Sequence, residues 1–192
     1  MSPRRVYSAL VHHPVKDRDG ASVATSVTNL DVHDIARSSR TYGLSGYYVV
    51  TPITAQHAIV DRILAHWRPG APGAGRVPQR AEALRLIQVA RSIEDAVADI
   101  EAREGRPPRV WATGARAPAG VDTLSFAEGG ERLRSDPEVP TLILFGTGHG
   151  LVGDTLAAAN AVLAPIRAGG DYNHLSVRAA AAIIFDRLFG ES

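Results

Sequence analysis

Short apolar runs alternate with amphipathic helical patterns along almost the whole chain. Runs of apolar and β-branched residues predict strands at 6–13, 47–50, 84–90, 110–113 and 141–145. Helical spacing and helix-starting residues predict helices at 31–42, 54–67, 92–104, 126–133 and 173–189. The run 141–145 is apolar throughout, which is typical of a strand covered on both faces in a parallel sheet. The alternation predicts an α/β fold with a mostly parallel sheet flanked by helices.

Local signals support several of these helices. Ser92 with Asp95 three residues later is a variant of the box that begins helices, and Gly105 with two prolines ends the same helix. Thr54 is expected to cap the helix that runs to Trp67. In the last segment, Val177, Ala180, Ala181, Ile184 and Leu188 recur at helical spacing. This pattern predicts a buried terminal helix.

The chain is expected to form one domain over residues 1–192. A chain of 192 residues, 45% of them hydrophobic, is long enough for one well-buried core. Residues 69–80 are rich in proline and glycine, which predicts a loop. We interpret it as a mobile surface loop and not a linker, because the part before it has too few strands to close a core of its own.

Composition excludes several kinds of chemistry. The chain has no cysteine, so it has no disulfide, thiolate metal site or cysteine nucleophile. His12 and His13 are adjacent on a predicted strand and point to opposite faces, which argues against a shared metal. No signal-peptide core or membrane-length apolar run is present, so a cytoplasmic location is expected. A net charge of +1 is weak for holding nucleic acid by charge alone.

Three segments late in the chain have the chemistry of ligand-binding loops. They are 113–116, 145–151 and 169–176, and each follows a strand or precedes a helix. Glycines after parallel strands let the backbone approach a nucleotide-like cofactor. Gly148, Gly150 and Gly153 also match the dinucleotide fingerprint of NAD enzymes. That fingerprint needs a βαβ unit with a second strand and an acidic residue about 20 positions on, whereas here only Val162–Ile166 precedes Asp171, which lies in a glycine-rich loop.

The order of these motifs resembles a known superfamily. The segments Leu144–Leu151 (LFGTGHGL), Leu163–Ile166 and Tyr172–Arg178 (YNHLSVR) are similar to the cofactor motifs of SPOUT methyltransferases. Asn29–Arg37 and Tyr42-Gly43 extend the resemblance to a small bacterial family of S-adenosylmethionine-dependent RNA methyltransferases. It implies a C-terminal trefoil knot, S-adenosylmethionine as cofactor, structured RNA (tRNA or rRNA) as substrate, and a homodimer with the terminal helix at its interface. No metal is expected.

The resemblance also implies a set of cofactor-binding residues, which contribute mainly backbone groups. They are Thr113, Gly114, Phe145, Gly146, Thr147, Gly148, Leu163, Pro165, Ile166, Asn173, His174, Leu175 and Ser176. For any one glycine, a role in a tight turn alone is the simpler interpretation. Three such loops together favour a cofactor site.

Three residues are candidates for catalysis, because methyl transfer needs a positioned nucleophile and a group that relays a proton. Arg37 lies one turn after His33, and the resemblance to SPOUT enzymes implies that it serves the RNA or the reacting centre; the alternative is a solvated helix face. His149 would act as a base or stack on a substrate base, or face solvent. Asn173 would orient hydrogen bonds beside the cofactor, or cap the last helix. A non-catalytic binding module of the same fold is the alternative function.

Overall fold

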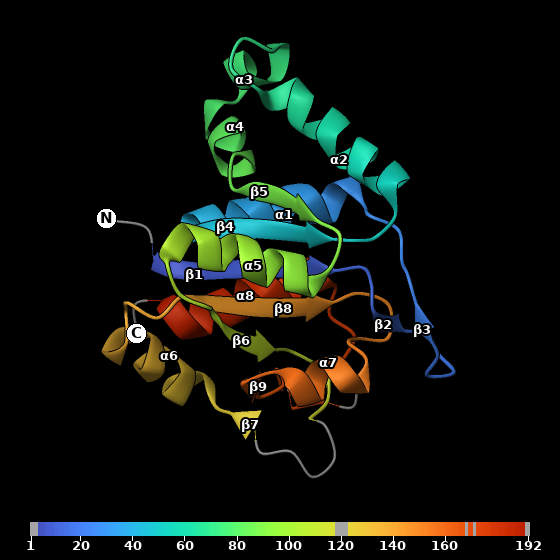
Figure 1. Ribbon diagram of the computed structural model, residues 1–192, viewed down its shortest axis with the longest axis vertical. Coiled ribbons are helices and arrows are strands. Elements are labelled where there is room, and N and C mark those ends of the chain that lie inside the picture. The colour runs from blue at the N-terminus through green and yellow to red at the C-terminus, as the bar shows by residue number, and fades with distance from the viewer. Residues whose placement is uncertain (1–3, 118–122, 168, 171, 191–192) are drawn as a thin grey trace.

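The computed structural model describes residues 4–117, 123–167, 169–170 and 172–190. A seven-stranded sheet has the order β5-β4-β1-β8-β6-β9-β7, and its strand pairs all run parallel (Figure 1). The strands are β1 (Arg4–Val11), β4 (Leu44–Val50), β5 (Ile87–Ala90), β6 (Arg109–Ala112), β7 (Thr123–Leu124), β8 (Thr141–Gly146) and β9 (Ala161–Leu163). A short antiparallel ribbon is formed by β2 (Val15–Lys16) and β3 (Ser22–Val23). The predicted α/β class is confirmed.

Helices cover both faces of this sheet. They are α1 (Asn29–Thr41), α2 (Thr54–Trp67), α3 (Pro72–Arg76), α4 (Pro78–Leu84), α5 (Ile93–Glu104), α6 (Phe126–Ser135), α7 (Gly153–Ala158) and α8 (Val177–Phe189). In Figure 1, α5 and α7 lie in front of the sheet, and α1 and α8 lie behind it. The helices α2, α3 and α4 extend beyond the β5 edge.

Strand β8 explains why its apolar run shows no alternation. Ile143 and Phe145 pack with α1 and α8, whereas Leu142 and Leu144 pack with α5. Successive side chains of a strand point to opposite faces, so a central strand covered on both sides needs apolar residues at every position.

The predicted helix boundaries are confirmed where capping chemistry is strong. The hydroxyl of Ser92 accepts a hydrogen bond from the backbone N–H of Asp95 at 3.2 Å and begins α5. Gly105 ends that helix in the left-handed conformation, at φ 75°. The helix α2 has the predicted bounds, but its N-cap is Ile53 and Thr54 is already helical.

Three predicted segments differ clearly from the structure. Residues 69–80 are not a continuous loop, because α3 and the start of α4 lie within them, each with proline in its first turn, where the missing N–H costs nothing. Since α4 runs through Leu84, the next strand begins only at Ile87. The last helix begins at Val177 and not at residue 173, because Ser176 is its N-cap.

Among the described residues, no helix is long and apolar enough to cross a membrane. No group of three or more histidine, aspartate or glutamate side chains in that same part of the chain is placed to hold a metal ion.

Candidate cofactor site

The predicted loops follow neighbouring strands at one edge of the sheet. Strands β8, β6 and β9 lie side by side and run parallel, so the residues after Gly146, Ala112 and Leu163 emerge at the same edge. Ligands of open parallel sheets bind at this carboxyl edge. The fold therefore gathers the loops in the way that the motif order suggested.

Asn173 joins two of these loops and the start of α8. Its side-chain Nδ2 donates to the backbone carbonyl of Ala115 at 3.0 Å and to that of Ile166 at 3.3 Å. Ala115 belongs to the loop after β6, and Ile166 to the loop after β9. Since Ser176 caps α8, the alternative role of Asn173 as the helix cap is wrong. Asp171, within the third predicted loop, lies outside the described residues.

The loop after β8 is built differently from the expectation, because it pairs with the β2 segment. The backbone N–H of His149 donates to Lys16 at 3.0 Å, and the N–H of Lys16 donates to Gly150 at 2.8 Å. Gly148 has a φ of +58°, and a Cβ on it would lie 3.0 Å from the carbonyl oxygen of Lys16. Position 148 therefore requires glycine, because the turn has a positive φ there and the backbone approaches β2 closely.

Buried side chains limit how other predicted residues take part. Phe145 and Leu163 are each 1% exposed and belong to the core, so only their backbone is available to a ligand. The hydroxyl of Thr113 donates to the carbonyl of Leu144 at 2.9 Å, which fixes the start of the loop after β6. A Cβ on Gly114 would lie 3.1 Å from the carbonyl of Arg116, so this turn is also tight. These residues shape the edge of the sheet with their main chain.

The segment before α8 presents its side chains outward. Tyr172 is 78% exposed and its ring lies 5.2 Å from the ring of His174. Leu175 is 46% exposed, and the hydroxyl of Ser176 accepts from Ala179 at 3.3 Å. Pro165 is partly buried and Ile166 is buried, on the β9 side. This exposed segment borders the edge where the loops gather.

The three catalytic candidates lie on three different segments of the structure. Asn173 lies at the junction of the loops, whereas His149 is exposed at the tip of the β8 loop. Arg37 is exposed on α1 and lies 3.5 Å from Asp34 in an ion pair. Arg37 therefore reaches the α8 segment only through Asp34.

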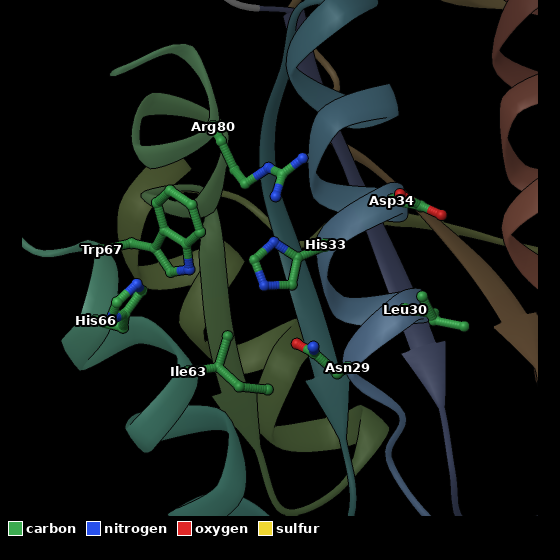
Figure 2. A pocket seen from close by; sticks show the side chains of 8 residues that line it. All are labelled: Asn29, Leu30, His33, Asp34, Ile63, His66, Trp67 and Arg80. Carbon is green, nitrogen blue, oxygen red and sulfur yellow. The ribbon is translucent and has the colours of Figure 1, made fainter. Parts of the chain in front are cut away.

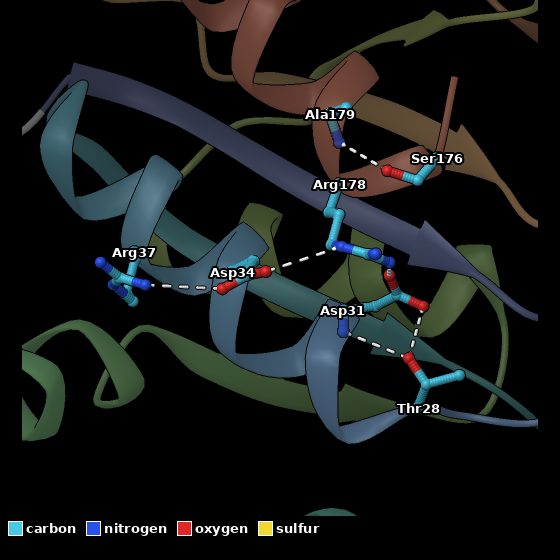
Figure 3. A network of polar contacts seen from close by, with 7 residues as sticks. All are labelled: Thr28, Asp31, Asp34, Arg37, Ser176, Arg178 and Ala179. Atoms are coloured by element: carbon cyan, nitrogen blue, oxygen red, sulfur yellow. Dashed lines mark hydrogen bonds and ion pairs between the residues drawn. The ribbon is translucent and has the colours of Figure 1, made fainter. Parts of the chain in front are cut away.

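Sequence reasoning missed Arg178, although it ends the YNHLSVR motif. Its Nη1 lies 3.2 Å from Asp31, and its Nε lies 3.6 Å from Asp34 (Figure 3). Asp31 also accepts a hydrogen bond from Thr28 at 2.6 Å. The spacing of Asp31 and Asp34 on one helix face was the available signal, but nothing in the sequence pairs that face with α8.

A buried polar chain underlies the β8 loop and was also missed. His12 is fully buried at the end of β1, and its Nδ1 lies 3.0 Å from the Thr25 hydroxyl. Thr25 in turn hydrogen-bonds the hydroxyl of Thr147. Burial lowers the pKa of His12 to about 4, and the charge of Asp31 opposes this shift only partly. The imidazole is therefore neutral at pH 7.

The residues present fit S-adenosylmethionine as a bound cofactor. A Cβ atom at Gly150 or Gly170 would have no neighbour within 4 Å, so the backbone is open on those sides. The polar groups at the edge are mostly main-chain carbonyls and amides, which can recognise an adenosine without dedicated charged side chains. The arrangement can hold and orient a nucleoside-containing ligand.

Comparisons with known proteins agree with this geometry. A family model described as "SAM-dependent RNA methyltransferase" matches residues 5–190. A protein of Oleidesulfovibrio alaskensis named "tRNA (guanine-N(1)-)-methyltransferase" is 49% identical over 189 residues, covering 98% of this chain and 43% of that protein. This chain thus spans less than half of that relative. An uncharacterized protein of Aquifex aeolicus is 39% identical over 192 residues, with 92% of it covered.

The fold has solved counterparts. The SpoU methyltransferase AviRb of Streptomyces viridochromogenes superposes with a TM-score of 0.57 at 18% identity, over 98% of this chain and 60% of that one. At such identity the likeness shows the SPOUT-type fold alone. Because the family model covers nearly the whole chain, the protein belongs to the family of SAM-dependent RNA methyltransferases.

Proposed function

We propose that the site at the carboxyl edge of β8, β6 and β9 binds S-adenosylmethionine and that methyl transfer to structured RNA takes place beside it. The observation that carries this proposal is the pair of hydrogen bonds from Asn173 to Ala115 and Ile166. It joins the loop after β6 to the loop after β9 and to the segment before α8, at the edge where parallel sheets bind nucleotides.

The cofactor supplies an electrophilic methyl group when it is bound. The chain contributes positioning: the backbone of the β6 and β9 loops would hold the adenosine, and the hydrogen bonds of Asn173 fix the distance between these loops. The Arg178–Asp31 contact anchors the start of α8 to α1. We assign proton relay to His149, and a contact with the RNA or with the reacting centre to Arg37; both side chains are exposed to an incoming RNA.

The target atom is proposed only as a base or ribose atom of tRNA or rRNA. The relative from Oleidesulfovibrio is named for methylation of guanine N1 in tRNA, but more than half of that protein lies outside the matching part. Its named activity therefore belongs to a longer protein, and the guanine specificity is not carried over. An RNA target agrees with the cytoplasmic location expected from the sequence.

A second copy of the chain is proposed to complete the site. The core-facing side of α8 is covered within its own chain, because Ala181, Ile184, Phe185 and Leu188 are buried. The exposed apolar side chains next to the loops are Tyr172 and Leu175, and these support an interface at the start of α8. The trefoil knot remains a prediction of the resemblance, supported by the passage of this segment beside the β6 and β9 loops.

Calorimetric titration with S-adenosylmethionine and S-adenosylhomocysteine tests the proposal, followed by transfer of a labelled methyl group to tRNA and rRNA. We expect about one site per chain, and labelled RNA whose digested nucleosides identify the base or ribose atom. Loss of turnover in His149→Ala with cofactor binding intact would support His149 as the proton relay, and the same loss in Arg37→Ala would support a contact of Arg37 with the RNA or the reacting centre. Cofactor binding without turnover on any RNA would support the non-catalytic alternative, and absence of cofactor binding would contradict the proposal.

A further inference from the structure

A pocket of about 430 Å³ lies between α1, α2 and α4. Figure 2 shows the side chains around it, among them Asn29, His33, Ile63, His66, Trp67 and Arg80. None of the lining residues belongs to the loops after β6, β8 or β9. The volume falls within the roughly 300–1,000 Å³ typical of small-molecule sites.

The indole of Trp67 contacts three other side chains of the pocket lining. The guanidinium of Arg80 lies over the indole at 5.5 Å from its centroid. The rings of His33 and His66 meet the same indole edge-on, at centroid distances of 5.6 and 5.3 Å. Trp67 is only partly buried, so part of its surface remains available to a planar ligand.

Unpartnered polar atoms gather at the same place. Among the described residues, four buried side-chain nitrogen or oxygen atoms lack a hydrogen-bond partner, and two of them are Nδ1 of His33 and Nε of Arg80. Such atoms cost free energy unless a ligand or water satisfies them. Burial lowers the pKa of His33 and the charge of Arg80 adds to this, so the imidazole is neutral and offers one donor and one acceptor.

Positive charge is concentrated around this pocket. Residues 54–86, which contain α2, α3 and α4, carry five arginines and two acidic residues, while the net charge of the whole chain is +1. The remainder of the chain is therefore net negative. Asp34, the one acidic residue of the pocket lining, is already paired with Arg37 and Arg178. A local excess of arginine is the electrostatic footprint expected for phosphate contact.

We propose that this pocket takes one unpaired nucleobase of an RNA, stacked on Trp67 and contacted by His33 and Arg80. RNA-binding proteins recognise unstacked bases with aromatic faces, guanidinium planes and hydrogen bonds to the base edges, and this pocket combines all three. A flanking phosphate would meet the arginines of α2–α4. This inference rests on the proposed function in one respect, namely that the ligand is RNA. The pocket would supply an RNA contact outside the methyl-transfer site.

Fluorescence and anisotropy measurements with ten-nucleotide oligouridylate and oligoadenylate, and with total tRNA, test the pocket. RNA should quench the emission of Trp67, and this quenching should be absent from Trp67→Phe, which retains buried Trp111. Trp67→Ala should weaken RNA binding by about 5- to 100-fold, the worth of one base–aromatic stack, and Trp67→Phe by only a few-fold. Arg80→Gln should weaken binding and reduce the salt dependence by about one released counterion.

Matched controls separate this inference from its alternatives. Arg134→Gln, on α6, removes the same charge from an exposed ion pair and should leave RNA binding unchanged.

Circular dichroism and thermal melting verify that each variant is folded, and Arg80→Gln alone provides the test if Trp67→Ala unfolds. If Trp67→Ala and Arg80→Gln both bound RNA with unchanged affinity and still bound S-adenosylmethionine, nucleobase binding in this pocket would be contradicted. The proposed methyltransferase function would not be affected. A changed oligomeric mass without a change in RNA affinity would show a protein interface and would also overturn it. Quenching by RNA in a protein that binds no S-adenosylmethionine would support the pocket alone.

Discussion

The guanidinium of Arg178 lies 3.2 Å from the carboxylate of Asp31, and this contact joins the first turn of α8 to the first turn of α1. The Asp31 side chain is 10% exposed and that of Arg178 is 36% exposed. The contact attaches the C-terminal end of the segment 172–176 to α1, and the hydrogen bonds of Asn173 attach the same segment to the loops after β6 and β9. The two anchors together hold this segment at the cofactor edge.

Replacing Arg178 with glutamine should lower the free energy of unfolding by about 1–3 kcal/mol, because the buried carboxylate of Asp31 loses its charged partner. Urea denaturation measures this change. The control is Arg37→Gln, because the side chain of its partner Asp34 is 43% exposed; the expected loss is about 0–1 kcal/mol. If both variants lost the same free energy of unfolding, the burial of Asp31 would not explain the effect of Arg178→Gln.

Asn173→Ala should weaken S-adenosylmethionine binding by about tenfold or more, because two loop carbonyls lose a donor of roughly 1 kcal/mol each and the loops separate. Calorimetry measures the affinity. Asn160→Ala is the matched control, since Asn160 accepts from the N–H of Val110 at 2.7 Å at the opposite edge of the sheet. It should reduce stability without changing cofactor affinity. A similar loss of affinity in both variants would point to general destabilisation.

Gly148→Ala should lower the free energy of unfolding by about 1–3 kcal/mol, because a left-handed residue with a Cβ is strained and here approaches Lys16. Thermal denaturation in the absence of ligand measures this loss. Gly153→Ala, at the open first position of α7, should be neutral or stabilise by up to about 1 kcal/mol. If Gly148→Ala abolished cofactor binding with stability intact, Gly148 would face the cofactor and not the β2 segment.

Stability should fall as the pH drops from about 6.5 to about 4. His12 has a pKa near 4 when folded, against 6.5 when unfolded, so between these values the unfolded chain binds more protons. The lowered pKa of His33 acts in the same direction. Urea denaturation at pH 5 and pH 7.5 should show this dependence, and His12→Gln should reduce it. An unchanged pH dependence in His12→Gln would exclude His12 as its source.

Much of the fold was predictable because its signals are local. The apolar run of β8, the capping by Ser92 and the glycine at position 105 each act within a few residues of chain. Residues 69–80 were misjudged because proline and glycine indicate a loop by composition, yet proline is equally suited to the first turn of a helix. The start of α8 was placed too early because apolar spacing does not reveal which residue caps a helix.

The sequence by itself determined the chemistry available to this protein: parallel strands followed by glycine-containing loops, no thiol, and the motif order of a SPOUT methyltransferase. Only the tertiary structure decided which loops meet, through the contacts of Asn173 with Ala115 and Ile166, and that Gly148 faces β2. It also brought Arg178 to Asp31 and placed Trp67 beside His33 of α1 and Arg80 of α4. Such pairings depend on the order of strands in the sheet and on which helix faces pack together, and no local pattern in the chain encodes the distance between them.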